Sequence, residues 1–381
     1  MHQNKSFNQT RVILVRHGRS TYNEQQRYQG CCDESVLTEQ GKQQAFQTGI
    51  ALSKINFDAI YASPLKRTQE TAKEILRVTN SSVQLHLNSN LKEVDLPGWQ
   101  GLEYKYVRQE LKEEYKTWEK SPHEFTIEKT EISGQTLIKT KTKPVLQLYE
   151  QAKSFWQEIL PRHQGKTVLV VSHGGTIRAL ISTATQIQAH NYHAIQQSNS
   201  GISIIDFQNT FSSNARITAI NLTQHLDEVL PKLKNGKHGL RLLLLPVNLS
   251  NNQANCNLGK LRSFLKQVEL NFCFTHDIYD TQLIIESIIN QSNPPFILQV
   301  SRVDFLDIWH QQISKRSLKC NELNTGLVIA NTNMISSLLS QALGLNSATS
   351  LQINSGELSV LFYPNCQSKP VLQAMNITEI L

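Results

Sequence analysis

Three short motifs in this chain each contain an arginine or a histidine and follow an apolar run of strand length. RHG at 16–18 follows Val12–Val15, SPLKRT at 63–68 follows Ala59–Tyr61, and SHG at 172–174 follows Val168–Val171. Because the carboxyl ends of parallel strands meet at one edge of an open α/β sheet, two arginines and two histidines should converge there. Such a cluster predicts a binding site for a small anionic molecule.

Alternating strands and helices are the elements expected to position these motifs. A helix should open at 37–41 and run to about Lys54, with Thr38 as its N-cap. Further helices are expected at 68–77, 101–119 and 176–186, and a long loop at 119–144. Other runs of strand length are Ile202–Phe207, Leu242–Leu245, Gly326–Ile329 and Leu358–Phe362. The alternation predicts a three-layer α/β fold, an open sheet with helices on both faces.

Several of these segments occur in two copies. RVILVRHGRS at 11–20 aligns with RLLLLPVNLS at 241–250, and VLVVSHGGTI at 168–177 aligns with GLVIANTNMI at 326–335. The intervening stretch contains the Lys, Gly and Asn residues typical of a linker. The sequence therefore predicts one domain at 1–226, a linker at 227–239 and a shortened second copy at 240–381.

Charge and composition favour a small anionic partner over nucleic acid or a membrane. The formal net charge is +7 over 381 residues, and almost all of the basic excess lies before residue 227. No Lys- and Arg-rich run with interleaved aromatic residues occurs, and no apolar run approaches the ~20 residues that a bilayer requires. The N-terminal residues lack a signal-peptide pattern, and six cysteines without CxxC spacing indicate reduced thiols. We therefore expect a cytoplasmic protein.

The motifs together resemble those of the histidine phosphatase superfamily, which contains cofactor-dependent phosphoglycerate mutases and many phosphatases. The resemblance covers about residues 11–222 and rests on RHGRSTYNEQQRYQG, LTEQGKQQA, SPLKRTQETA and SHG. It implies a phosphoglycerate mutase-like fold for the first domain. It also implies that the anion is a phosphate ester.

The resemblance assigns roles to individual residues. His17 would be the nucleophile that forms a phosphohistidine, with its other ring nitrogen donating to a backbone carbonyl. Glu93, in LKEVDLPGWQG, would be the general acid and then the base. Arg16 and Arg67 would bind the phosphate, and a protonated His173 would stabilise charge in the transition state. The remaining expected phosphate or substrate contacts are Gly18, Ser20, Asn23, Gln29, Gly30 and Gly174.

This mechanism needs no metal ion and no cofactor. His190 and His193 have the spacing of one helix face, but no third metal ligand is evident nearby in the sequence. The expected partner is a small phosphorylated metabolite, with neither nucleic acid nor a membrane, and the oligomeric state is left open.

Phosphatase activity is favoured over mutase activity. Mutases of the family follow the catalytic Glu with Arg-His-Tyr and carry a later Arg-Arg pair, whereas here Val-Asp-Leu follows Glu93 and no such pair occurs at 94–172. The segments GLEYKYVRQELKEEYKTWEKSPHEF and KPVLQLYEQAKSFWQEILPRHQGKTVLVVSHGG are similar to the tandem-domain 2-carboxy-D-arabinitol-1-phosphatase proteins of cyanobacteria and plants, which implies a sugar or sugar-acid phosphate as substrate. Arg19, where most relatives carry an acidic residue, and Gln135 depart from the pattern and leave substrate preference open.

The second copy lacks the basic groups of the first. The alignment gives Pro246, Val247, Asp280 and Asn331 in place of the two arginines and two histidines. This copy cannot perform the same chemistry by itself. We expect a retained structural half, with a binding or regulatory module as the alternative.

Overall fold

A computed structural model describes most of the chain. The described residues are 9–79, 82–133, 136–208, 215–233, 238–247, 258–276, 296–300, 309, 311, 322–345, 348–365 and 368–377. The predictions for Gln135 and Asp280 lie outside them. The chain divides into two compact units, Met1–Ile217 with Ile380–Leu381 and Thr218–Glu379.

The sheet of the first unit brings the carboxyl ends of three parallel strands to one edge. Its strands are β1 Gln9–Arg16, β2 Ala59–Ala62, β3 Leu85–Leu87, β6 Thr167–Ser172 and β7 Ile202–Gln208, in the order β7-β1-β6-β2-β3. Only β7 runs antiparallel to its neighbour in this order. Arg16 pairs with Ser172 and Ala62 with Val171, so the three motifs begin at the same level. The strand predictions in this unit are confirmed.

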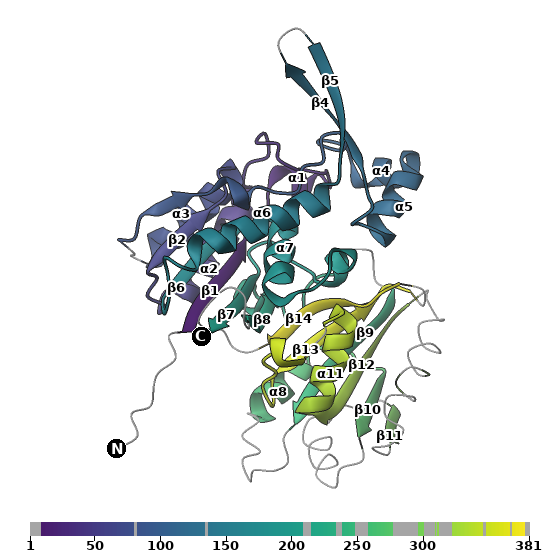
Figure 1. The fold of residues 1–381 in the computed structure, drawn as a ribbon. Coiled ribbons are helices and arrows are strands. Elements are labelled where there is room, and N and C mark those ends of the chain that lie inside the picture. Colours follow the sequence, from purple (N-terminus) through teal and green to yellow (C-terminus); the bar gives the residue numbers. More distant parts are fainter. Residues whose placement is uncertain are drawn as a thin grey trace. The chain divides into compact units, whose positions relative to one another are not determined.

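Helices cover both faces of this sheet. The helices of this unit around the sheet are α1 Thr21–Glu24, α2 Glu39–Leu52, α3 Lys66–Thr79, α6 Pro144–Ile159 and α7 Gly174–Thr185, with 3-10 turns η1 Ser89–Leu91 and η2 Ala189–Ala194. The 3-10 turn η3 Gln224–Leu226 belongs to the second unit. α2 packs against α3 and α6 against α7, which gives two helical pairs around the strands (Figure 1). The run Val12–Val15 is fully buried, as expected for a strand covered on both sides. Thr38 caps α2 as predicted, because its side chain accepts from Gly41 N at 3.0 Å.

Two predictions for the segment between Gly101 and Pro144 are wrong. The single helix expected at 101–119 is two helices, α4 Tyr104–Glu110 and α5 Lys112–Lys120, because the backbone leaves helical geometry at Leu111 (φ −108°, ψ 45°). Strong helix formers lie on both sides of this break, so no residue type marks it.

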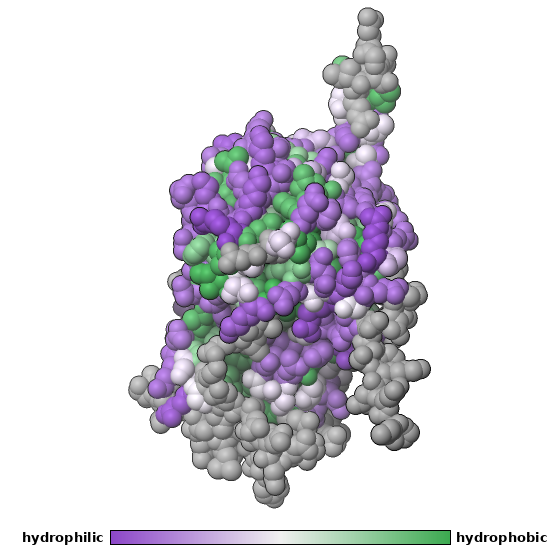
Figure 2. Space-filling view, turned by 90° about the vertical axis from the view of Figure 1, so that its left-hand side faces the viewer, coloured by the Kyte–Doolittle hydropathy of each residue, from purple (hydrophilic) through white to green (hydrophobic). Residues whose placement is uncertain are grey.

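The loop expected at 119–144 is largely a β-hairpin. β4 Ile127–Ser133 pairs antiparallel with β5 Thr136–Thr142, and the ribbon projects from the first unit (Figure 1). Leu137 and Ile138 are 67% and 44% exposed, and apolar atoms are visible on the ribbon in Figure 2. Apart from the buried Ile127, the described side chains of this ribbon are exposed or half-buried. Such a ribbon needs no apolar alternation, and the sequence therefore lacks the usual strand signal.

The second unit repeats the strand arrangement of the first. Its elements are β9 Gly239–Val247, α8 Leu258–Leu265, β10 Phe272–His276, β11 Phe296–Val300, β12 Leu323–Asn331, α11 Thr332–Leu343, η4 Ala348–Ser350, β13 Leu358–Tyr363 and β14 Val371–Ile377. The order is β13-β9-β12-β10-β11, and only β13 runs antiparallel to its neighbour in it. β8 Ala215–Leu222 contains the boundary between the units, and its Ile220 faces Met375 of β14. In these two strand orders β9 takes the position of β1 and β12 the position of β6, in agreement with the sequence alignment of the two copies.

The positions that match the motifs have ordinary structural roles in the second unit. Pro246 and Val247 are the last residues of the buried strand β9. Asn331 is the N-cap of α11, and its Oδ1 accepts from Met334 N at 2.9 Å. Among the described residues of the whole chain, no helix is both long and apolar enough to cross a bilayer.

Candidate active site

His17 lies at the centre of the edge where β1, β6 and β2 end. Its backbone N–H donates to Ser172 O at 2.9 Å, and its ring is 1% exposed. Nδ1 lies 2.8 Å from Gly18 O, which confirms the predicted contact with a backbone carbonyl. Burial and the charges of Arg67 and Arg16 lower the pKa of His17 well below 6.5. With Nδ1 protonated and donating, the neutral ring keeps a lone pair on Nε2.

Arg67 is fully buried near the start of α3. Its Nη1 donates to Cys32 O at 2.8 Å and its Nη2 donates to Gly30 O at 2.9 Å. Gly30 has a φ of +53°, a backbone conformation that glycine adopts at little cost. The loop that carries Gln29 and Gly30 is therefore shaped around this guanidinium.

Arg16 is the last residue of β1 and lies against the start of α7. Its Nη1 donates to Gln197 O at 2.9 Å. A Cβ on Gly174 would lie 3.2 Å from Arg16 Nε, so the glycine permits this close approach. The Nε atoms of Arg16 and Arg67 are buried and have no hydrogen-bond partner among the described residues. Buried guanidinium N–H groups without partners are costly, and an anion would satisfy them.

His173 is the N-cap residue of α7 and is fully buried. Its Nε2 lies 2.9 Å from Ser63 Oγ, and its Nδ1 has no partner among the described residues. Burial, Arg67, His17 and Arg16 lower the pKa of His173 well below 6.5. The ring is therefore neutral in the site without an anion, and the expectation of a protonated His173 in the transition state stays a prediction. A bound phosphate would act in the opposite direction, because a nearby negative charge favours the imidazolium.

Glu93 reaches the same edge from the loop after η1. Its Oε2 accepts from Gly175 N at 3.1 Å and its Oε1 accepts from Thr176 N at 3.2 Å, both in the first turn of α7. The loop itself is tied down, because Ser172 Oγ donates to Leu91 O at 2.9 Å. The carboxylate thus lies at the amino terminus of a helix, where the backbone N–H groups stabilise negative charge.

A chain of polar side chains joins α1 to the backbone of His17. Ser20 Oγ lies 3.0 Å from Asn23 Oδ1 and 2.9 Å from Gln29 Oε1, and the Ser20 side chain caps α1. Asn199 Nδ2 lies 3.0 Å from both Asn23 Oδ1 and His17 O. Ser20, Asn23 and Gln29 are therefore linked to the nucleophile's backbone through Asn199.

The two glycines expected to offer backbone donors differ. The N–H of Gly18 donates to Thr71 Oγ1 at 3.0 Å, so its prediction as a phosphate donor is wrong. A Cβ on Gly18 would lie 2.3 Å from Gly41 O, so the glycine is needed for close packing of two backbones. Gly174 opens α7, and its N–H donates to no group within the described residues. The backbone N–H of Gly174 can therefore donate to a ligand, whereas that of Gly18 is bound to Thr71.

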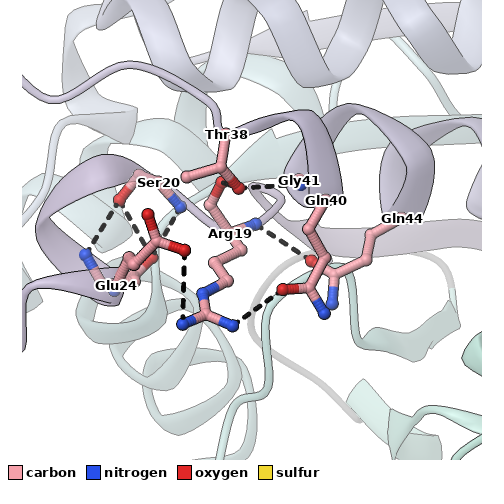
Figure 3. A network of polar contacts seen from close by, with 8 residues as sticks. Arg19, Ser20, Glu24, Thr38, Gln40, Gly41 and Gln44 are labelled. Carbon is pink, nitrogen blue, oxygen red and sulfur yellow. Dashed lines mark hydrogen bonds and ion pairs between the residues drawn. The ribbon is translucent and has the colours of Figure 1, made fainter.

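The side chain of Arg19 contacts α1 and α2. Its Nη1 donates to Gln40 Oε1 at 2.7 Å and its Nη2 lies 3.6 Å from Glu24 Oε1, as Figure 3 shows. Its backbone N–H donates to Gln44 Oε1 at 3.0 Å. Arg19 therefore fastens the loop after β1 to α2. Its guanidinium is 37% exposed, so the ion pair adds little stability.

Several residues at this site were not predicted from the sequence. Asn199, Ser63 and Thr71 contact the predicted residues directly, and Gly175 and Thr176 hold Glu93. Ser63, Thr71, Gly175 and Thr176 lie inside the quoted segments SPLKRTQETA and VLVVSHGGTI, so these segments contained a signal for them. Asn199 belongs to an Asn-Ser-Gly tripeptide that recurs at 354–356, and this repeat was the available signal.

Residues 12–220, more than half of the chain, match the family described as the histidine phosphatase superfamily, branch 1. The chain belongs to the histidine phosphatase superfamily. The family expected from the motifs is thereby confirmed, and the mixed sheet with its helices matches the phosphoglycerate mutase-like fold.

Curated relatives include two plant proteins and one bacterial protein. "Probable 2-carboxy-D-arabinitol-1-phosphatase" of Arabidopsis thaliana is 39% identical over 197 residues, 52% of this chain and 38% of that protein. "2-carboxy-D-arabinitol-1-phosphatase" of Triticum aestivum is 38% identical over 201 residues, 52% of this chain and 37% of that protein. "Phosphoserine phosphatase 1" of Hydrogenobacter thermophilus is 32% identical over 218 residues, 57% of this chain and 95% of that protein. The chain thus spans less than two-fifths of the length of the plant relatives.

Proposed function

We propose that this protein is a phosphomonoester hydrolase that acts through a phosphohistidine on His17, without a metal ion, on a small sugar or sugar-acid phosphate. The observation that carries the proposal is the state of His17. The ring is buried and neutral, its Nδ1 lies against Gly18 O, and Arg16 and Arg67 are close enough to lower its pKa. A neutral imidazole held in one tautomer among guanidinium groups is suited to attack a phosphate ester.

The first step transfers the phosphoryl group to the protein. The lone pair of His17 Nε2 forms a bond to phosphorus while the bond from phosphorus to the alcohol oxygen breaks. The electron pair of that bond stays on the alcohol oxygen, which takes a proton from Glu93. Arg16 and Arg67 hold the phosphoryl oxygens, and the phosphate charge favours protonation of His173.

The second step releases phosphate. A water molecule attacks phosphorus and gives a proton to Glu93, which is ionised after the first step. The bond between phosphorus and Nε2 breaks, and its electron pair returns to His17. Every group ends in its starting state, so a catalytic cycle needs only substrate and water.

The substrate class rests on the relatives and on the resemblance. The two plant proteins are named for 2-carboxy-D-arabinitol 1-phosphate, and the third relative is named for phosphoserine. All of these compounds join a phosphate monoester to a carboxylate. We therefore propose a phosphorylated sugar acid, with 2-carboxy-D-arabinitol 1-phosphate as the first compound to test.

The second unit is proposed as a retained structural half. Asn331, at the position of His173, serves as a helix cap, and Val247, at the position of His17, is buried in a strand. We also propose the cytoplasm as the compartment, which the free thiols of Cys31, Cys32 and Cys273 support.

A panel of phosphomonoesters tests the proposal. It contains 2-carboxy-D-arabinitol 1-phosphate, xylulose 1,5-bisphosphate, phosphoserine and 3-phosphoglycerate, assayed for released phosphate with EDTA present. We expect turnover of a sugar-acid phosphate that His17→Ala removes. Activity that EDTA abolishes, or that survives in His17→Ala, contradicts the mechanism. Conversion of 3-phosphoglycerate to 2-phosphoglycerate in the presence of 2,3-bisphosphoglycerate would indicate a mutase instead.

A further inference from the structure

Two side chains from distant parts of the chain meet over Gly175, the second residue of α7. A Cβ built on Gly175 would lie 2.3 Å from Glu93 Oε1 and 2.4 Å from the hydroxyl oxygen of Tyr192. Both contacts are closer than real Cβ atoms allow, so the space that a side chain would fill is occupied by these two oxygens. The absence of a side chain at Gly175 thus lets the proposed acid and a tyrosine lie side by side.

Tyr192 is fixed and buried, and its hydroxyl lies close enough to Glu93 and Arg178 for both to shift its pKa. The residue is 1% exposed, and its hydroxyl has no hydrogen-bond partner among the described residues. Its ring has edge contacts with Trp118 and His193, with centroids 5.8 and 5.0 Å apart, and the Arg178 guanidinium lies over it at 5.5 Å. Burial, together with the charge of Glu93, raises the pKa of Tyr192, so the phenol is neutral. A buried hydroxyl without a partner is costly and requires an explanation.

The closest groups that hold Glu93 are backbone N–H donors, which stabilise its ionised form. Gly175 N, Thr176 N and Val94 N are backbone donors to the carboxylate, at 3.1, 3.2 and 2.9 Å. The Thr176 hydroxyl lies 3.4 Å from Oε1 but is closer to Lys92 O, at 2.8 Å. A general acid must also carry a proton, and an N–H group cannot accept a hydrogen bond from it. Tyr192 has a hydroxyl that can donate to the carboxylate and accept from the carboxylic acid.

We propose that Tyr192 is the positioning residue for Glu93, and that Gly175 is required because it lets the two side chains meet. The proposal rests on the proposed function, in which Glu93 protonates the departing alcohol. Tyr192 holds the carboxyl group against the first turn of α7 in both protonation states. Its contribution should therefore appear only when the leaving group needs a proton.

The test compares two leaving groups, with both units of the chain present. The ratio of kcat/KM for an alkyl phosphate to kcat/KM for p-nitrophenyl phosphate is measured for the wild type and for Tyr192→Phe. The quantity kcat/KM reports the steps up to phosphohistidine formation, and p-nitrophenolate leaves without protonation. We expect Tyr192→Phe to lower kcat/KM about tenfold for the alkyl ester and less than twofold for the aryl ester. Equal losses on both esters, or no loss on either, would overturn the positioning role.

Three further variants make the result specific. Tyr149→Phe is the matched control, because Tyr149 is also buried, with its ring 6.4 Å from that of Tyr192, and Glu93 is not among the groups that shift its pKa. Its ratio should equal the wild-type ratio. Gly175→Ala places a methyl group between Glu93 and Tyr192 and should lower the ratio as Tyr192→Phe does. Glu93→Gln is the reference. If Glu93→Gln leaves the ratio unchanged, the acid role of Glu93 in the proposed function is contradicted. If Glu93→Gln lowers the ratio and Tyr192→Phe does not, only the positioning role of Tyr192 is overturned.

Discussion

The ring of His173 stands edge-on to the ring of His17, with the centroids 5.3 Å apart and the planes at 63°. Both rings are buried beside Arg67, and burial is the main reason why both pKa values lie well below 6.5. The site therefore presents two neutral imidazoles between guanidinium groups. When a phosphate binds in such a site, its negative charge raises the pKa of His173 and favours the imidazolium form.

The acid limb of the pH profile should reflect this neutral state. An exposed histidine would be half protonated near 6.5, and a protonated His17 cannot attack phosphorus. Because the pKa of His17 is lowered, we expect kcat/KM to stay high at about one pH unit below 6.5. Steady-state kinetics on the preferred substrate across this range provides the measurement. A fall of about fivefold between 6.5 and that pH, from half of the rings neutral to about one in eleven, would mean that His17 titrates like an exposed histidine.

Protein stability should fall on the acid side of 6.5. At pH values between the lowered folded-state pKa of His173 and its unfolded pKa near 6.5, His173 is protonated in the unfolded chain and neutral in the folded protein. Unfolding is therefore favoured by about 1.4 kcal/mol per pH unit for each such group. His173→Asn should reduce the dependence of the melting temperature on pH in this window. An unchanged dependence would show that His173 accepts a proton in the folded protein.

Replacement of Arg67 by lysine should damage the site although the charge is kept. Arg67 spans Cys32 O and Gly30 O with its two terminal nitrogens, and a single ammonium group cannot make both contacts. We expect Arg67→Lys to lower kcat/KM by at least tenfold, since a charged hydrogen bond is worth about 1.5–3 kcal/mol. Arg19→Lys is the matched control, because Arg19 is partly exposed and contacts Gln40 and Glu24 instead (Figure 3). Equal effects of the two substitutions would argue against a specific role for Arg67.

Asn331 offers a test of the second unit. If this residue only caps α11, Asn331→Ala should cost about 1 kcal/mol of stability and leave kcat/KM unchanged. Asn331→Asp keeps a side-chain oxygen for Met334 N and should restore the stability. Thermal unfolding together with kinetics distinguishes the possibilities. A loss of activity at full stability would instead support a regulatory role for this unit.

Much of the fold could be predicted because its strands are buried on both faces. Runs such as Val12–Val15 must be apolar throughout, and the residue that follows each run lies at the reactive edge. This logic found Arg16, His17 and His173. It could not find the hairpin of β4 and β5, whose exposed ribbon has no apolar pattern.

Other parts of the site depend on contacts that no sequence pattern encodes. Asn199 reaches His17 from the loop before β7, and Tyr192, in a 3-10 turn, lies with Glu93 over Gly175. The role of Gly18 was misjudged because its N–H is satisfied by Thr71, which lies 53 positions away in the chain. Local motifs therefore predict which residues react, whereas tertiary contacts decide which donors remain free.

The most direct test of the central claim is the chemical identity of the intermediate. A rapid acid-free quench of the protein with its preferred substrate, followed by peptide mass spectrometry, would detect phosphate attached to a histidine. We predict a phosphohistidine on the peptide that contains His17, labile to acid and stable to base, and absent from His17→Ala. Turnover with no phosphoenzyme at any time, or phosphate attached to another residue, would contradict the mechanism.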